Sequence, residues 1–553
     1  MFQSPVVVSN LSFTWPDDTP VFHDLGFSLD TGRIGLVAPN GAGKSTLLRL
    51  ISGALTPTAG SVTVEGVLGY LPQDLPLTAG RTVAEVLGVA DVIAALDAIE
   101  SGDTDERHFT TIGDDWDVED RARVELDRLG LGHVSLREPL GALSGGQIVS
   151  LGLAALLIQH PDVLLLDEPT NNLDLAARHK LYDVLDGQRG CVLVVSHDRE
   201  LLDRMDRIAE LDAGEIRFYG GNFSAYEEAV AAERENAERN LRNAEQELKR
   251  EKREMQQARE RADRRASTAA KNLKSAGLPR IFAGNMKRGA EKAAGSAQTM
   301  HASRVSEAKE RADQAAKAVR ADQSIALDLP DTQVPAGRTL FVGEQLRKRL
   351  GDAEIFAGDG IDLAIRGPER IALSGGNGAG KSTLMRLIHG DLEPDSGTVR
   401  RADGRVAYLS QRLDLLEDDK TVAENFAAFA PALPDAQRLN VLARFLFRGT
   451  RIHLPVRVLS GGERLRATLA CVLYAEPAPH LLLLDEPTNN LDLVSVAQLE
   501  SALNAYRGAF IVVSHDERFL DAIGIERRIT LSEPEPEPEP EPVPSASEEP
   551  GAR

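Results

Sequence analysis

The sequence predicts an α/β protein made of two homologous domains joined by an antiparallel helical hairpin. Three observations support this prediction: a set of motifs that occurs twice, short apolar strands around those motifs, and a long helix-forming stretch between the two sets. The chain has 553 residues, a length typical of about three to four domains. Its residues are 42% hydrophobic and 27% charged, an ordinary globular composition.

Four motifs occur twice and in the same order. They are NGAGKST (from residues 40 and 377), LSGG (143 and 459), LLLDEPTNNLDL (164 and 482) and VVSHD (194 and 512). Internal repetition on this scale indicates two homologous domains, which we place at residues 1–220 (the first domain) and 330–531 (the second domain). Lys44 and Ser144 are 100 positions apart, but Lys381 and Ser460 only 79, so the first domain has 21 extra residues before LSGG.

The segment between the domains, residues 221–329, is predicted to be an antiparallel coiled-coil hairpin. Residues 223–276 contain no Gly or Pro, and the apolar residues recur in a heptad stripe that is interrupted once, at Glu251. Gly277 and Pro279 end this helix. A flexible charged linker is the alternative, but continuous helix formers with an apolar seam are not a linker composition. The stripes are Ala237, Leu241, Ala244, Leu248, Met255, Ala258 and Ala262 in the first helix, and Val305, Ala308, Ala312, Ala315 and Val319 in the second.

The far end of the predicted hairpin is basic. Residues 259–292 contain ten Lys or Arg and three Asp or Glu, a net charge of +7 in a chain of net charge −22. Such a segment is typical of proteins that bind the phosphate backbone of a nucleic acid. The alternative interpretation is a solvated helix surface. The predicted RNA-binding residues are Arg280, Lys287, Arg288 and Lys292.

Other features of the composition bear on location. No run of 18 apolar residues predicts a membrane-spanning helix, and the N-terminus does not resemble a secretory signal. Two cysteines, Cys191 and Cys471, are too few for a disulfide framework or a zinc finger. A reducing cytoplasm is therefore the expected location. Residues 532–553 are rich in Glu and Pro, and we expect an extended, disordered acidic tail.

Each domain contains a glycine-rich loop after a short apolar strand, at 34–37 and 371–373. The loop at 375–382 matches G-x-x-x-x-G-K-[ST] in full, whereas the loop at 38–45 begins with Ala38, which fits only with a negative φ. In this motif backbone N–H groups surround phosphate oxygens, the Lys neutralises β/γ-phosphate charge and the Ser hydroxyl ligates Mg²⁺. The predicted nucleotide-binding residues are Asn40, Gly41, Gly43, Lys44, Ser45 and Thr46, then Gly375, Asn377, Gly378, Gly380, Lys381, Ser382 and Thr383.

A second apolar strand ends in two carboxylates in each domain, at 164–168 and 482–486. Such strands lie in a buried parallel sheet. We predict that Asp167 and Asp485 bind Mg²⁺. We predict that Glu168 and Glu486 polarise the water that attacks the γ-phosphate.

Five further residues are candidates because of their position beside these motifs. His197 and His515 each follow a third apolar strand and can contact the γ-phosphate. Gln73 and Gln411 offer amides that can orient Mg²⁺ or water. Trp15 lies 29 positions before Lys44 and can stack on adenine; a core tryptophan is the alternative.

The LSGG motifs each precede a predicted helix, at 148–158 and 464–473. A serine and glycine N–H groups at a helix start form an anion site. Ser144 and Gly146, or Ser460 and Gly462, lie far along the chain from the loop of their own domain. A motif at this distance does not easily serve its own loop, and the other copy of the domain can present it instead.

Together these motifs resemble those of ATP-binding cassette ATPases. Two cassettes in one chain, DEPTNNLD in both halves and a charged two-helix linker preceded by YGGNFSAYEE are similar to the F subfamily (ABC-F). The resemblance covers about residues 5–531. It implies a monomer whose cassettes close head to tail on two ATP molecules with Mg²⁺. It also implies a ribosomal partner, with the linker inserted toward the peptidyl-tRNA and the peptidyl-transferase centre.

Carried over to this chain, the resemblance implies two composite sites. The Lys44 site would use Lys44, Ser45, Gln73, Asp167, Glu168 and His197 with Ser460 and Gly462. The Lys381 site would use Lys381, Ser382, Gln411, Asp485, Glu486 and His515 with Ser144 and Gly146. Two departures, Ala38 in the first loop and the apolar Ile148 and Val149 after LSGGQ, predict that these sites are unequal.

The leading functional interpretation is a translation factor that hydrolyses ATP on the ribosome. An antibiotic-resistance protein that displaces drugs from the ribosome would use the same architecture, and the motifs do not separate the two. The energising subunit of a transporter is a further alternative, but it has no use for a basic hairpin. A DNA-acting cassette ATPase would carry zinc modules or very long coiled coils within a cassette, and the sequence has neither.

Overall fold

The structure is a computed structural model. It describes residues 4–73, 80–171, 173–212, 214–275, 299–300, 302–316, 329–350, 353–356, 359–376, 378–402, 405–489 and 491–531. The predicted RNA-binding residues Arg280, Lys287, Arg288 and Lys292, the loop residue Asn377 and the acidic tail lie outside the described residues. The chain divides into two compact units, one formed by Met1–Phe223 with Gln323–Arg553 and the other by Ser224–Asp322.

The first domain combines an antiparallel sheet with a mostly parallel one. Strands β1 (Val6–Thr14), β2 (Pro20–Leu29) and β4 (Ala59–Val64) form the antiparallel sheet in the order β2-β1-β4. The larger sheet has the order β5-β6-β7-β3-β8-β9, in which only β9 is antiparallel to its neighbour. Its strands are β3 (Gly32–Val37), β5 (Leu68–Leu71), β6 (Val163–Asp167), β7 (Cys191–Val195), β8 (Arg207–Asp212) and β9 (Glu215–Gly220).

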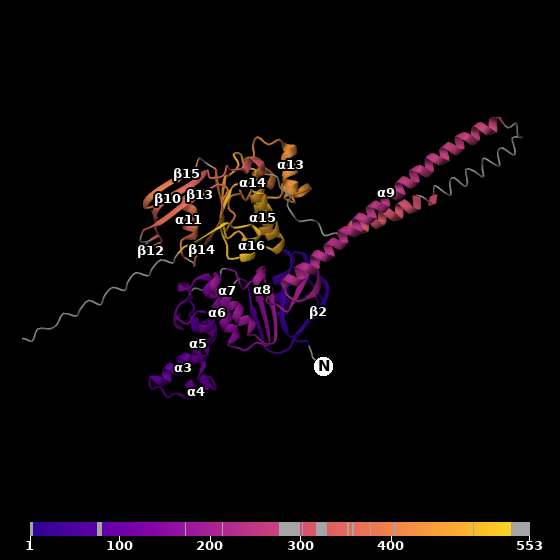
Figure 1. Cartoon of the computed structure of the whole chain (residues 1–553). Coiled ribbons are helices and arrows are strands. Elements are labelled where there is room, and N and C mark those ends of the chain that lie inside the picture. Colours follow the sequence, from indigo (N-terminus) through magenta and orange to yellow (C-terminus); the bar gives the residue numbers. More distant parts are fainter. Residues whose placement is uncertain are drawn as a thin grey trace, which may run out of the picture. The chain divides into compact units, whose positions relative to one another are not determined.

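The second domain repeats this plan. Strands β10, β13 and β15 form the antiparallel sheet, and the parallel sheet has the order β16-β17-β18-β14-β19. Figure 1 shows β10, β13 and β15 on one side of this domain and helices α14, α15 and α16 on the other. The strands are β10 (Thr339–Arg347), β11 (Arg349–Leu350), β12 (Ala353–Glu354), β13 (Ile361–Arg366), β14 (Arg370–Ser374), β15 (Ser396–Arg401), β16 (Val406–Leu409), β17 (Leu481–Asp485), β18 (Ala509–Val513) and β19 (Arg527–Thr530).

The central strands are apolar and buried along their whole length, as expected for a parallel sheet covered on both faces. All five residues of β6, β7, β17 and β18 are buried. Strands β3 and β14 are paired with β7 and β18 at the centre of their sheets. The phosphate loops that follow β3 and β14 therefore start at the carboxyl edge, where β6 and β17 also end.

Helices connect the strands of each sheet. In the first domain they are α1 (Lys44–Ile51), α2 (Val83–Leu87), α3 (Ala90–Glu100), α4 (Glu106–Ile112), α5 (Val118–Arg128), α6 (Gly145–Leu157), α7 (Leu175–Asp186) and α8 (Arg199–Leu202). In the second they are α11 (Lys381–His389), α12 (Val422–Phe429), α13 (Asp435–Arg444), α14 (Gly461–Leu473), α15 (Leu493–Ala505) and α16 (Glu517–Ala522). Short 3₁₀ helices lie at Leu140–Ala142, Pro330–Thr332, Gly449–His453 and Val456–Val458.

The 21 extra residues of the first domain form additional helix. Among the described residues between the phosphate-loop helix and LSGG, the first domain has the α-helices α2, α3, α4 and α5, and the second domain has the α-helices α12 and α13. Figure 1 shows α3, α4 and α5 together at one end of the first domain. The insertion is therefore a short helical extension.

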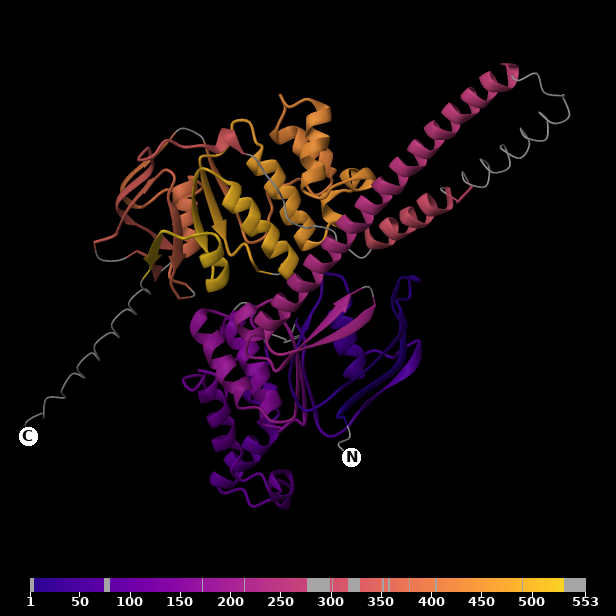
Figure 2. The same cartoon turned by 45° about the vertical axis from the view of Figure 1, so that its right-hand side comes forward.

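The hairpin has the two helices that the sequence predicts. Helix α9 (Phe223–Ser275) has 53 residues, and a second helix covers residues 302–316. The two helices lie side by side in both views (Figure 1, Figure 2). Ala308 and Ala312 of the predicted seam are buried, and Arg311 pairs with Glu247 of α9 at 2.9 Å. Val319 lies outside the described residues.

No described helix is both long and apolar enough to cross a membrane.

Candidate functional site

The first phosphate loop lies between β3 and α1, and its lysine is buried. Lys44 is 9% exposed. Its Nζ donates to the Ala38 carbonyl at 2.9 Å and the Asn40 side-chain oxygen at 3.4 Å, and lies 3.1 Å from His197 Nε2. Burial lowers the pKa of Lys44. Within the described residues the ammonium is thus held by polar groups that a phosphate could replace.

The second loop lies between β14 and α11, and its lysine is held by loop carbonyls. Lys381 Nζ donates to the carbonyls of Gly375 at 2.8 Å and Gly376 at 3.0 Å. The lysine is half-buried and lines a cavity. Both phosphate-loop helices begin after a glycine in the left-handed conformation, Gly43 and Gly380.

The two loops also start differently. Gly375 has a φ of 150°, and a Cβ there would lie 2.8 Å from the Leu531 carbonyl oxygen. The structure therefore accounts for a glycine at this position. Ala38 is buried and is not among the described residues with positive φ. The condition under which an alanine fits this position is therefore met.

Each predicted catalytic glutamate lies just after its strand in a strained backbone conformation. Glu168 has a φ of 50° and Glu486 a φ of 47°, values that are uncommon for residues other than glycine. The backbone N–H of Glu168 donates to the Val195 carbonyl, and that of Glu486 to the Val513 carbonyl. Strain of this kind is typical of functional sites, and here it turns the carboxylate out of the strand.

The predicted histidines meet these glutamates in both domains. His197 Nε2 lies 3.3 Å from Glu168 Oε1, and His515 Nε2 lies 3.3 Å from Glu486 Oε1. Burial raises the pKa of Glu168 to about 8 and that of Glu486 to about 7. Burial also lowers the pKa of His197 to about 3 and that of His515 to about 4. Burial thus favours the uncharged form of both imidazoles and makes both glutamate carboxylates more basic.

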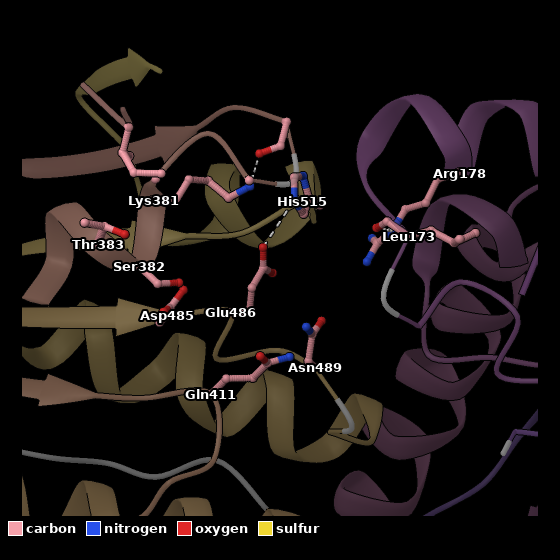
Figure 3. Close-up of a pocket in the computed structure, with 14 residues that line it drawn as sticks. Leu173, Arg178, Lys381, Ser382, Thr383, Gln411, Asp485, Glu486, Asn489 and His515 are labelled. Atoms are coloured by element: carbon pink, nitrogen blue, oxygen red, sulfur yellow. Dashed lines mark hydrogen bonds and ion pairs between the residues drawn. The ribbon is translucent and has the colours of Figure 1, made fainter. Parts of the chain in front are cut away.

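The Lys381 site contains a cavity of about 470 Å³. Figure 3 shows Lys381, Ser382 and Thr383 on one side of it, with Glu486 and His515 between them and the first domain. The structure thus brings together most residues predicted for this site. Those that line the cavity are Gly378, Gly380, Lys381, Ser382, Thr383, Gln411, Asp485, Glu486 and His515.

The residues predicted to bind Mg²⁺ fit an ion shared with a nucleotide. Ser382, Gln411 and Asp485 line the same cavity, and Tyr408 donates to Asp485 Oδ2 at 2.9 Å, which orients that carboxylate. Among the described residues no group of three or more His, Cys, Asp or Glu could hold a metal alone. Mg²⁺ usually keeps few protein ligands and relies on phosphates. The donor set therefore fits Mg²⁺ bound together with phosphate.

Two predicted contacts have less support from geometry. Gln73 is exposed, close to the end of the described segment 4–73. Trp15 is half-buried against the core of the first domain, with its ring perpendicular to that of Phe13 at a centroid distance of 5.0 Å. The adenine contact of Trp15 stays a prediction. In the second domain Ile355, which sequence reasoning did not identify, lines the cavity near Gly380.

The LSGG serines begin helices as expected. Ser144 caps α6 and Ser460 caps α14, each in a capping box with Gln147 or Glu463. Both serines are exposed, whereas Gly146 and Gly462 are buried. Ser144 and Gly146 are not among the residues that line the cavity at the Lys381 site. Their predicted contact with ATP in the other domain stays a prediction.

Contacts between the two domains involve residues that sequence reasoning missed. The Asn40 backbone N–H donates to Asp492 Oδ2 of the second domain at 2.8 Å. Leu173 and Arg178 of the first domain line the cavity at the Lys381 site. Asp492 and Leu173 belong to the repeated NNLDL segment, so the repetition itself was the available signal; Arg178 lies beyond the repeat.

Comparison with protein families gives a match in both halves of the chain. The family described as ABC transporter matches residues 22–171 and 359–489. The tylosin resistance ATP-binding protein of Streptomyces fradiae is 36% identical over 91% of this chain and 93% of its own length. The probable ATP-binding protein YbiT of Escherichia coli O157:H7 is 30% identical over 94% of both chains.

A solved structure shares the fold. An archaeal ribosome recycling factor, in complex with an archaeal ribosomal stalk protein, superimposes with a TM-score of 0.57 and 18% identity. The match covers 94% of this chain and 87% of that chain. At this identity the likeness concerns the fold alone.

Proposed function

The chain belongs to the ATP-binding cassette family as an F-type member with two cassettes, and from this premise we propose that it acts in translation as a ribosome-bound ATPase. It is an ATPase, as its cassettes and its ATP-binding relatives indicate. The two cassettes are the first and second domains. The observation that carries the ribosomal part of the proposal is the long hairpin between them, which ends in a basic segment.

In the proposed reaction, Lys44 and Lys381 neutralise phosphate charge, and the loop N–H groups hold the phosphate oxygens. Glu168 and Glu486 orient the attacking water and accept its proton as general bases. His197 and His515, each 3.3 Å from its glutamate, hold these carboxylates toward the γ-phosphate. Because their imidazoles are neutral near pH 7, the histidines leave the acceptor capacity of the carboxylates intact.

Ser45 and Ser382, with Asp167 and Asp485, would hold Mg²⁺. Bound Mg²⁺ supplies charge neutralisation on the phosphate oxygens. Asp485 is pre-oriented for this role by Tyr408 at 2.9 Å.

The length of the hairpin helix and the basic segment of the sequence support this proposal. A helix of 53 residues extends about 80 Å at 1.5 Å per residue. Fields are screened within about 8 Å at physiological ionic strength, so such a helix can carry a basic end beyond the field of an acidic chain. The segment of net charge +7 suits rRNA or tRNA phosphates near the peptidyl-transferase centre.

ATP would control the binding. We infer that the ATP-closed state is the ribosome-bound state, and that hydrolysis releases it. Such control requires that ATP and the ribosome favour the same conformation. A variant that binds ATP without hydrolysing it should therefore stay on the ribosome.

The test uses the full chain with Glu168→Gln and Glu486→Gln. Cosedimentation with ribosomes is measured with ATP at several salt concentrations, with and without Ala at Arg280, Lys287, Arg288 and Lys292. The logarithm of the binding constant falls linearly with the logarithm of the salt concentration, and each lost phosphate contact should make this slope shallower by about 0.7–0.9. The fourfold variant should therefore bind more weakly and with a shallower slope.

The matched control removes four exposed arginines from the cassettes and leaves the hairpin intact. Arg107, Arg137, Arg217 and Arg400 are at least 61% exposed and form only surface ion pairs. Their replacement by Ala changes the net charge equally and should leave the slope unchanged. Equal slopes in both variants would mean that the basic segment is only a solvated surface.

Antibiotic resistance by ribosome protection is the second candidate. It is favoured by the 36% identity to a tylosin resistance protein over almost the whole of both chains. Expression of the chain in a tylosin-sensitive strain should then raise the inhibitory tylosin concentration, and Glu168→Gln with Glu486→Gln should abolish the increase. Growth that does not depend on the drug, together with ATP-dependent ribosome binding, would favour the translation factor.

A further inference from the structure

Arg178 is a charged residue at the Lys381 site that comes from the other cassette. It lies in the first turns of α7, four positions after the helix cap Asp174. Its side chain is 12% exposed. None of the motifs that repeat in the two cassettes includes it.

The arginine lines the same cavity as Lys381, Ser382, Glu486 and His515. Figure 3 shows its side chain extending from the first cassette toward Glu486 and His515, from the side opposite Lys381. Burial is the largest influence on the pKa of Glu486, and the Arg178 charge opposes it. The guanidinium thus faces the place where a terminal phosphate would lie between Lys381 and Glu486.

Its own cassette positions the guanidinium but leaves donors available. Nε donates to the Leu173 carbonyl at 3.2 Å, and the nearest carboxylate, Asp198, lies 3.7 Å from Nη1. Asp198 in turn accepts a hydrogen bond from Tyr182 at 2.6 Å. A guanidinium has five N–H donors, and within the described residues one of them is used in a hydrogen bond. A planar guanidinium binds carboxylate and phosphate groups with two parallel hydrogen bonds, and the terminal phosphate of ATP is a ligand of this kind.

The second cassette has an apolar residue at the position that corresponds to Arg178. The two copies of this segment are offset by 318 positions, so Val496 corresponds to Arg178. Val496 is 3% exposed and packs in the hydrophobic core of the second cassette. An arginine at this position of the helix is therefore specific to the first cassette.

We propose that Arg178 binds the terminal phosphate of ATP held at the Lys381 site, so that the first cassette completes this site with an arginine. The inference rests on the proposed assignment of the Lys381 loop as an ATP site. ATP carries a γ-phosphate that ADP lacks, so the contact distinguishes the two nucleotides. ATP bound at this site then draws the first cassette toward the second.

The test measures nucleotide affinity, not turnover. Full-length protein with Lys44→Ala, Glu168→Gln and Glu486→Gln retains one binding loop and does not hydrolyse ATP. Equilibrium binding of labelled ATP and ADP is compared with and without Arg178→Gln. Loss of a charge-assisted hydrogen bond should weaken ATP binding by about tenfold to a hundredfold and leave ADP affinity within about twofold.

Two further variants separate phosphate binding from a structural role. Arg178→Lys keeps the charge and should restore part of the ATP affinity. Arg189→Gln removes an exposed arginine of the same cassette and should change neither affinity. Equal weakening of ATP and ADP in Arg178→Gln, or unchanged ATP affinity, would overturn the inference. Failure of the parent protein to bind either nucleotide would instead refute the Lys381 loop as an ATP site.

Discussion

The two nucleotide sites of this chain share their motifs but differ in how each lysine and loop is held. Lys44 is buried against Ala38, Asn40 and His197, and Asn40 is bonded to Asp492 of the other cassette. Within the described residues, Lys381 donates to the loop carbonyls of Gly375 and Gly376, and it faces a cavity of about 470 Å³. Duplicated motifs therefore do not imply duplicated environments.

The difference involves Asp492, which belongs to a shared motif, and Arg178, which lies beyond it. At the Lys44 loop, Asp492 of the opposite cassette accepts a hydrogen bond from the Asn40 N–H. At the Lys381 site the opposite cassette presents Arg178, and the charge of its Asp174 acts on His515. An anion at the first loop has to compete with the Asp492 carboxylate, while an anion at the second would be attracted by the guanidinium.

The largest effect is expected from the two glutamates together. Glu168→Gln with Glu486→Gln should lower ATP turnover by about 10²–10⁴-fold, because an amide cannot accept the proton of the attacking water. ATP binding should persist, since the phosphate loops are unchanged. Steady-state phosphate release and ATP binding measure the two properties, and turnover at the wild-type rate would refute the assignment.

A smaller effect should separate the two loops. Gly375→Ala forces a residue with a Cβ into a φ of 150° and against the Leu531 carbonyl, at a cost of about 1–3 kcal/mol. The reverse change, Ala38→Gly, introduces no clash and should cost only about 0.4–1 kcal/mol through the unfolded chain. Denaturant unfolding of both variants measures the costs, and equal values would remove this distinction between the loops.

The smallest effect concerns pH. Burial holds the pKa of His197 at about 3, below its usual 6.5, so the unfolded chain binds a proton first as pH falls. The contribution of His197 to the free energy of unfolding is fully present above pH 6.5 and is lost as the pH falls toward 3. Between pH 6.5 and 5.5 the loss should be about 1 kcal/mol, and His197→Asn should reduce it.

Denaturant unfolding of the nucleotide-free protein at several pH values measures how the free energy of unfolding changes with pH. His515, whose pKa is lowered to about 4, should give the same change over this pH interval when it is replaced by Asn. A steeper acid loss in either variant than in the wild type would contradict the burial argument for that histidine.

The sequence was sufficient for features that depend on local chemistry. The phosphate loops, the buried strands ending at Asp167 and Asp485, and the hairpin seam at Ala308 and Ala312 all follow from residue type and spacing. It was also sufficient to count the extra residues of the first cassette, but not to show that they include α4, because short polar segments give a weak periodic signal.

The features that could not be predicted depend on how distant segments pack. The bond between Asn40 and Asp492 joins residues 452 positions apart, and Arg178 matters only because the first cassette faces the cavity of the second. The left-handed backbone of Glu168 and Glu486 also depends on bonds to the neighbouring strands β7 and β18. None of these relations leaves a pattern in the local sequence.

The most direct test of unequal sites compares the single variants Glu168→Gln and Glu486→Gln. Each blocks hydrolysis at one site and leaves the other active. Steady-state ATPase rates and the ATP and ADP retained per chain after rapid desalting are measured for both. The account predicts different rates and different retained nucleotide in the two variants; indistinguishable values for both quantities would contradict it.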